Sequence, residues 1–217
     1  MKKNSLFMFV FIFGLIMLSC QSNEEKAQEL IGKEFFQTLN DFDSYEPIKT
    51  VVKEAKKSAT TDPECFAAAD LLTELLNNAF DITKEMQSSL DHMELWVDSY
   101  TAQGERKYNE YKKEFAGQKE QVVKNIKTQH IVLEKLKNSV TNMDTTIVVG
   151  WEIYHRFRCK DNTGQSFVKD YRFVATESFD KILIKEDATV AKYEKIRKII
   201  NEVISGEYEK TLNNIWL

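Results

Sequence analysis

Residues 62–104, DPECFAAADLLTELLNNAFDITKEMQSSLDHMELWVDSYTAQG, decide the fold of this chain. Asp62 is a good helix cap, and Pro63 suits a first helical position because its missing N–H breaks no intrahelical bond. Beyond them, apolar residues recur every three or four positions as far as Gly104. This pattern predicts one helix of roughly 40 residues, about 60 Å long.

A second stripe of the same period runs from Tyr108 to Val140. Neither helix could bury its stripe alone, and a short connection at Gly104 would make the two helices antiparallel neighbours. We therefore expect a long helical hairpin, resembling a short coiled coil, over residues 62–141. One continuous helix that pairs with a second copy is the alternative.

The period of the apolar residues changes from about 3.6 to 2 after Asn142. Residues 146–159 are predicted as a strand, 161–164 (DNTG) as a turn, 167–175 as a returning strand and 179–184 as a third strand. Residues 190–204 then predict an amphipathic helix.

The region before the hairpin is less regular. Residues 24–39 predict a first helix, whereas 48–60 fit either a strand or a short helix. We expect an α+β fold that is mainly helical: the hairpin, a small antiparallel sheet of two to three strands, and a C-terminal helix. That last helix, with the first, is the candidate cover for the sheet. The expected segments are 1–19, 20–61, 62–141 and 142–217, the last forming one domain with the first helix.

Composition restricts the function classes. The 217 residues are 42% apolar and 29% charged, with a net charge of −4, which disfavours phosphate backbones and hence nucleic acid. The sequence holds neither a glycine-rich phosphate loop nor a histidine-carboxylate metal motif, so we expect no cofactor and no metal. No catalytic constellation can be identified, and we expect a protein that is not an enzyme.

The N-terminus is typical of an export signal. Lys2 and Lys3 precede a run of thirteen almost wholly apolar residues, Leu6 to Leu18, whereas a spanning helix needs about 20. Ser19 and Cys20 follow at once. Residues 1–19 are therefore predicted as a signal peptide, with a retained membrane anchor as the alternative.

The segment Met17-Leu18-Ser19-Cys20 resembles the lipobox of bacterial lipoproteins, although lipoboxes usually have Leu where Met17 stands and a small residue where Leu18 stands. The resemblance implies that Cys20 becomes the first mature residue and carries fatty acyl chains such as palmitate, which anchor the protein to a membrane. Cleavage by an ordinary signal peptidase is the alternative. Residues 21–25 (QSNEE) resemble the acidic export signal of surface lipoproteins in Bacteroides-type bacteria, which favours the cell surface of the outer membrane over its periplasmic side.

Two cysteines remain once Cys20 is acylated. An exported protein could join Cys65 to Cys159 in a disulfide, but two separate, partly buried thiols are the simpler interpretation. His155 lies on the apolar side of its predicted strand, where we interpret it as a structural histidine with satisfied hydrogen bonds.

Aromatic residues gather near the expected hairpin tip. Trp96, Tyr100, Tyr108 and Tyr111 could form a contact patch, on which sugar faces could also stack, although packing between the helices is the simpler reading. Trp216, in an apolar end to a polar segment, could dock on the body or form part of such a patch.

The whole mature chain resembles a group of uncharacterised lipoproteins from Bacteroides-type bacteria. The resemblance is carried by residues 26–39, 43–47 (DSYEP), 108–111 (YNEY) and 150–158 (GWEIYHRFR). It implies location and fold, and no catalytic residue. We expect a cell-envelope lipoprotein that is a binding or assembly module for another envelope protein. A lipoprotein that binds glycans or small ligands is the alternative, and an unrecognised enzyme is a third.

Overall fold

The computed structural model describes residues 21–39 and 41–208, and its chain divides into two compact units. The sheet unit contains the described residues up to Lys56 together with Thr146–Val190. The helical unit contains Lys57–Thr145 and the described residues from Ala191 onward. The hairpin is thus inserted into the sequence of the sheet unit. No helix within the described ranges is long and apolar enough to cross a membrane.

The sheet unit is an antiparallel sheet of four strands in the order β1 (Glu46–Lys56), β2 (Val148–Lys160), β3 (Ser166–Ala175) and β4 (Ile182–Asp187). The α+β class is confirmed, but the expected count of two to three strands is wrong. The additional strand is β1, which occupies the region that fitted either a strand or a short helix. The third expected strand begins later than 179, because residues before Ile182 form a turn in which Phe179 has a positive φ of 57°.

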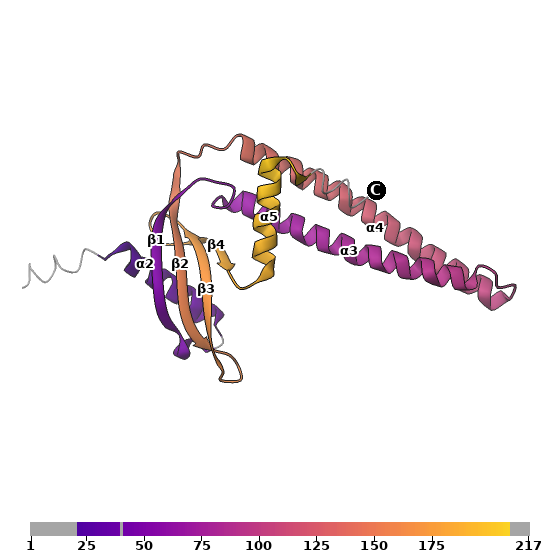
Figure 1. The fold of residues 1–217 in the computed structure, drawn as a ribbon, viewed down its shortest axis with the longest axis horizontal. Helices are drawn as coiled ribbons and strands as arrows, with labels where there is room; N and C mark the ends of the chain where they lie inside the picture. Colours follow the sequence, from indigo (N-terminus) through magenta and orange to yellow (C-terminus); the bar gives the residue numbers. More distant parts are fainter. Residues whose placement is uncertain (1–20, 40, 209–217) are drawn as a thin grey trace, which may run out of the picture. The chain divides into compact units, whose positions relative to one another are not determined.

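Helix α2 (Asn23–Thr38) covers one face of this sheet (Figure 1). Its first turn is closed by a capping box, in which Glu25 N–H donates to Ser22 Oγ and Ser22 N–H donates to the Glu25 carboxylate. Phe35, fully buried, lies 4.6 Å from Phe157 between ring centroids. A short 3₁₀ helix, η1 (Phe42–Ser44), joins α2 to β1. The core of the sheet unit is Ala27, Ile31, Phe35, Ile153, Phe157, Cys159, Phe173 and Ala175.

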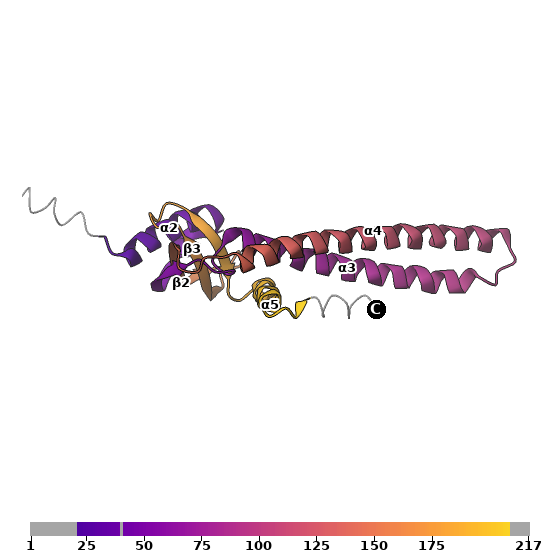
Figure 2. The same cartoon turned by 90° about the horizontal axis from the view of Figure 1, so that it is seen from above.

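The helical unit consists of α3 (Pro63–Trp96), α4 (Ala102–Thr141) and α5 (Ala191–Ser205). Helices α3 and α4 form the expected antiparallel hairpin (Figure 2), rather than one continuous helix. Asp62 caps α3 as predicted, accepting hydrogen bonds from the N–H groups of Glu64 and Cys65.

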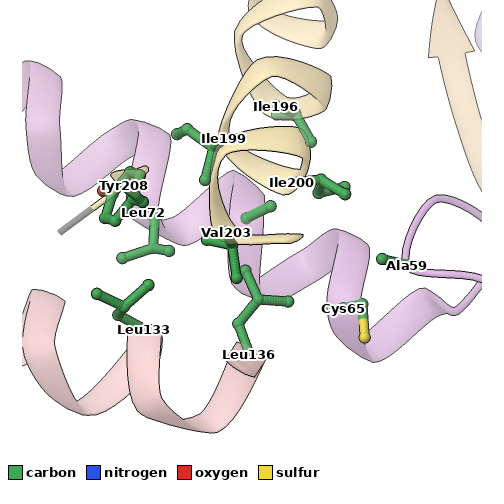
Figure 3. Close-up of a cluster of buried hydrophobic side chains, with 11 residues drawn as sticks. Ala59, Cys65, Leu72, Leu133, Leu136, Ile196, Ile199, Ile200, Val203 and Tyr208 are labelled. Atoms are coloured by element: carbon green, nitrogen blue, oxygen red, sulfur yellow. The ribbon is translucent and has the colours of Figure 1, made fainter. Parts of the chain in front are cut away.

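Helix α5 packs against α3 and α4, so it belongs to the helical unit and not, as we expected, to the unit of the sheet. Its Ile196, Ile200 and Val203 enter a cluster with Leu72 of α3 and Leu136 of α4 (Figure 3). Two different helices therefore cover the two apolar faces: α2 covers the sheet, and α5 covers the part of the hairpin that contains Leu72 and Leu136.

Candidate interaction surface at the hairpin tip

The tip of the hairpin is the five-residue connection from Val97 to Thr101 with the adjoining turns of α3 and α4. Thr101 caps α4, since its Oγ1 accepts a hydrogen bond from the Gly104 N–H at 3.1 Å. Gly104 is buried in the first turn of α4, so it is not the junction that we expected. A Cβ on Gly104 would lie 1.9 Å from Ser99 Oγ, which is why only glycine fits there.

Three large apolar side chains in the last turn of α3 and in this connection are exposed to solvent. The exposed fraction is 75% for Leu95, 59% for Val97 and 100% for Tyr100. Val97 and Tyr100 lie on the apolar stripe of the helix predicted up to Gly104, and we expected both to be buried. Because α3 ends at Trp96, neither residue packs against α4 as that stripe requires. Leu95 was missed, because it lies off the stripe. The turn-forming Asp98 and Ser99 were the signal that the helix ends before Gly104.

The other aromatic residues of the expected patch lie beside the tip and are half-buried. Tyr111 stacks on His92 across the two helices, with ring centroids 4.6 Å apart and planes within 13°. Lys112 Nζ lies 5.9 Å from the centre of the Tyr108 ring. Trp96, the last residue of α3, is half-buried as well. Tyr100 alone of these four expected patch residues is fully exposed.

Charged side chains of both signs flank the exposed apolar residues in the sequence. Lys107 donates to Glu110 at 2.8 Å, which lowers the pKa of the Glu110 carboxyl below its usual range. Residues 91–113 carry five carboxylates and four cations: Asp91, Glu94, Asp98, Glu105 and Glu110, with Arg106, Lys107, Lys112 and Lys113. The tip therefore offers exposed apolar side chains flanked by charged residues of both signs.

The remaining candidate residues lie elsewhere. Cys65 and Cys159 are free thiols, each buried in the core of a different unit, so the disulfide between them is not formed. Burial raises the pKa of both thiols, that of Cys65 to about 11 with a contribution from Asp62. Cys20 and Trp216 lie outside the described residues. Within the described part of the chain, no group of three or more His, Cys, Asp and Glu side chains could hold a metal ion.

His155 is buried beneath α2 in the sheet unit. Tyr45 Oη lies 2.8 Å from its Nε2, and Thr50 Oγ1 lies 3.0 Å from its Nδ1. Both ring nitrogens of His155 therefore have a hydrogen-bond partner, which agrees with its interpretation as a structural histidine.

Comparison with known proteins returned no match: no family model, no curated protein and no solved structure is similar to this chain.

Proposed function

We propose that this chain is a lipid-anchored protein of the cell envelope, without enzymatic activity, that binds another envelope protein through the hairpin tip. The observation that carries the proposal is Tyr100, wholly exposed on a structured turn between Leu95 and Val97 on one side and the capped start of α4 on the other. A large aromatic side chain in water adds almost nothing to folding, whereas Tyr is among the residues that contribute most to protein interfaces.

The geometry of the tip supports a binding role. The turn is fixed by hydrogen bonds, since Ser99 N–H donates to the Trp96 carbonyl at 3.1 Å and Thr101 Oγ1 lies 3.1 Å from Ser99 Oγ. A fixed turn loses little conformational entropy on binding, so its apolar side chains are preorganised for a partner. The partner surface should carry an apolar pocket for Tyr100.

The location is part of the proposal and comes from the sequence. The lipobox-like segment ending at Cys20 and the acidic residues after it favour a lipoprotein of the outer membrane that faces the cell surface. A lipid anchor holds the protein at a membrane without a spanning helix, which leaves the hairpin available for contacts with proteins.

Glycan binding has weaker support. A sugar-binding tryptophan needs an open ring face, but Trp151 stacks on Phe179 with centroids 5.5 Å apart, and its indole N–H donates to the Glu177 carbonyl. Trp96 is half-buried at the end of α3. The residue with free faces is Tyr100, and a single exposed ring on a convex turn suits a protein pocket better than a sugar.

A photo-crosslinking amino acid in place of Tyr100 tests the binding role in living cells. We expect a discrete crosslinked band of constant mass. The matched control is the same substitution at Ile131, which is 71% exposed on α4 away from the tip and should give no such band. Equal crosslinking at both positions would show that the tip is not a specific surface.

Anchoring and location need their own experiment. Protease treatment of intact cells should digest a tagged protein at the surface, whereas a periplasmic protein is protected until the outer membrane is opened. A Cys20→Ala variant should lose both incorporation of labelled palmitate and its place in the membrane fraction. If that variant remains in the membrane, the lipoprotein assignment is wrong.

A further inference from the structure

The seam between α3 and α4 continues in the sequence beyond the end of α3. Its last members on α3 are residues 89, 93 and 96, and its first members on α4 are residues 104, 108 and 111, all of them buried or half-buried. Tyr100 lies four positions after Trp96 and four before Gly104, so it continues the same helical period. A helix that ran through the connection would therefore place Tyr100, now 100% exposed, on the seam.

The connection Val97–Thr101 lacks the residues that usually end a helix. It contains neither Gly nor Pro, and none of its five residues has a positive φ. Many helices end on a glycine in the left-handed region, which interrupts the helical backbone. Val97, by contrast, already has the helical angles φ −59° and ψ −37°. At most four residues, 98–101, have to change for α3 and α4 to become one helix.

Local hydrogen bonds hold the closed turn. Ser99 N–H donates to the Trp96 carbonyl at 3.1 Å, and Gly104 N–H donates to Thr101 Oγ1 at 3.1 Å. Such bonds contribute about 0.5–1.5 kcal/mol each, and a continuous helix would replace them with its own backbone bonds. The closed turn is therefore favoured mainly because an opened helix would leave its seam without a partner.

A second copy of this chain can supply that partner. Across the hairpin, His92 stacks on Tyr111, and Asn125 Nδ2 donates to Asn78 Oδ1 at 2.9 Å. Both pairs are centred on the same point of the sequence, between positions 101 and 102. Two opened chains that lie antiparallel can therefore form the same pairs between copies, in the same register.

We propose that the hairpin opens at its connection and that two copies of this chain exchange halves to form a dimer. The residues before the connection in one copy complete their fold with the residues after the connection in the other. The contacts between α3 and α4 are those of the closed hairpin, and the shared seam gains both Tyr100 rings. Because association costs translational and rotational freedom, the dimer fraction rises with protein concentration.

The exchange goes beyond the proposed function and does not depend on it. One consequence does rest on the proposed function: the dimer has no tip, because its connection is helical and Tyr100 is covered. Exchange would then withdraw the surface that binds the envelope partner.

Two glycine variants test the exchange. A Cβ on Gly104 would overlap Ser99 Oγ in the closed turn, whereas alanine is the better residue within a continuous helix. Gly104→Ala should therefore raise the dimer-to-monomer ratio at least about tenfold. The matched control is Gly117→Ala in α4, where a Cβ meets no atom within 4 Å and the ratio should not change. Size-exclusion chromatography with light scattering measures the ratio for the purified Cys20→Ala chain, which carries no acyl group.

The role of Tyr100 has a variant of its own. Tyr100→Ser, added to Gly104→Ala, should lower the dimer-to-monomer ratio at least about tenfold, because two aromatic rings leave the seam. The monomer should stay folded, since Tyr100 is fully exposed in it. An unchanged ratio would show that Tyr100 does not lie on the dimer seam.

A pair of cysteines distinguishes exchange from the association of two closed hairpins. His92→Cys with Tyr111→Cys, in the Gly104→Ala chain, puts thiols at facing positions of α3 and α4 that a short bis-maleimide can join. The native Cys65 and Cys159 are buried in the folded chain. Crosslinking of the isolated dimer should link two chains, which then run at twice the chain mass on a denaturing gel. Links within single chains, or no dimer of Gly104→Ala at any concentration, would overturn the proposal.

This result and the test of the tip are independent. The thiol experiment uses the purified chain and needs no envelope partner, so it can fail while the tip binds. Conversely, a photo-crosslinked product at Tyr100 that contains a second protein supports the tip whatever the outcome of the exchange experiment.

Discussion

Tyr45 and His155 form a hydrogen bond of 2.8 Å in the interior of the sheet unit, 110 positions apart in the sequence. The imidazole is also stacked on Phe157, with centroids 5.6 Å apart. Burial lowers the pKa of His155 to about 4 and raises the pKa of Tyr45 to about 12. Both side chains therefore remain neutral at physiological pH and connect η1 and β1 to β2 through uncharged hydrogen bonds.

The lowered pKa of His155 predicts an acid-sensitive sheet unit. In the unfolded chain the pKa of His155 is about 6.5, so between pH 6.5 and pH 4 the unfolded state binds the proton that the folded state excludes. This contribution to stability is complete above pH 6.5 and is lost as the pH falls towards 4. We expect a loss of about 2 kcal/mol between pH 7.5 and pH 5. Urea unfolding at both pH values measures it, and the His155→Gln variant should lack this part of the pH dependence.

Two glycines of α4 should respond to alanine in opposite ways. Gly104→Ala places a Cβ 1.9 Å from Ser99 Oγ and should destabilise the tip by about 1–3 kcal/mol, the usual cost of overpacking. Gly117→Ala meets no atom within 4 Å and should stabilise the helix by about 0.5–1 kcal/mol. Thermal unfolding of both variants compares them. Adding Ser99→Gly to Gly104→Ala should restore stability; if it does not, the close approach is not the cause.

A polar layer inside the hairpin predicts a non-additive pair of substitutions. Gln129 Nε2 donates to Asn125 Oδ1 at 2.7 Å, and Asn125 Nδ2 donates to the Leu75 carbonyl at 3.1 Å. Asn125→Leu should cost about 1–3 kcal/mol, because the buried Gln129 amide loses its acceptor. The double variant Asn125→Leu/Gln129→Leu should recover most of that loss. Denaturant unfolding of the four members of the cycle measures the coupling, and simple additivity would contradict it.

The exposed tip should tolerate polar substitution. Tyr100→Ser removes a side chain that is 100% exposed, so we expect the free energy of unfolding to change by less than about 0.5 kcal/mol. The same variant should bind the partner at least tenfold more weakly, as the loss of a central aromatic residue does at interfaces. A Tyr100→Ser protein that unfolds more easily would indicate that Tyr100 contributes to folding and not to binding.

Helices and hairpins could be predicted from the sequence where a cap, an apolar period or a turn marked them within a few residues. The cap at Asp62 and the apolar periods of α3, α4 and α5 were sufficient to predict these three helices. The turn at residues 161–164 was sufficient for the β2–β3 pair, whose register joins His155 to Tyr171. The exact end of α3 could not be predicted, because Val97 and Tyr100 continue the apolar period beyond Trp96, where the helix ends.

Long-range partners could not be predicted. Strand β1 pairs Thr50 with His155, and nothing near Thr50 in the sequence indicates a partner more than 100 positions away. The sequence also did not indicate which helix covers the sheet and which covers the hairpin. Phe35 of α2 and Ile196 of α5 both lie on amphipathic helices. Only the packed cores show that Phe35 packs against the sheet and Ile196 against the hairpin. Nor did the sequence indicate that Tyr208 would be buried with no hydrogen-bond partner for its hydroxyl among the described residues.

The insertion of the hairpin between β1 and β2 has a kinetic consequence. During synthesis, α2 and β1 emerge first, and about 90 residues separate β1 from β2. Closing so long a loop by a random search is slow, but a hairpin of two local helices folds rapidly and brings its own ends together. We therefore expect α3 and α4 to form early and β1–β2 pairing to limit the folding rate. For the same reason, whole helical turns could be added to or removed from both arms of the hairpin while the sheet keeps its register.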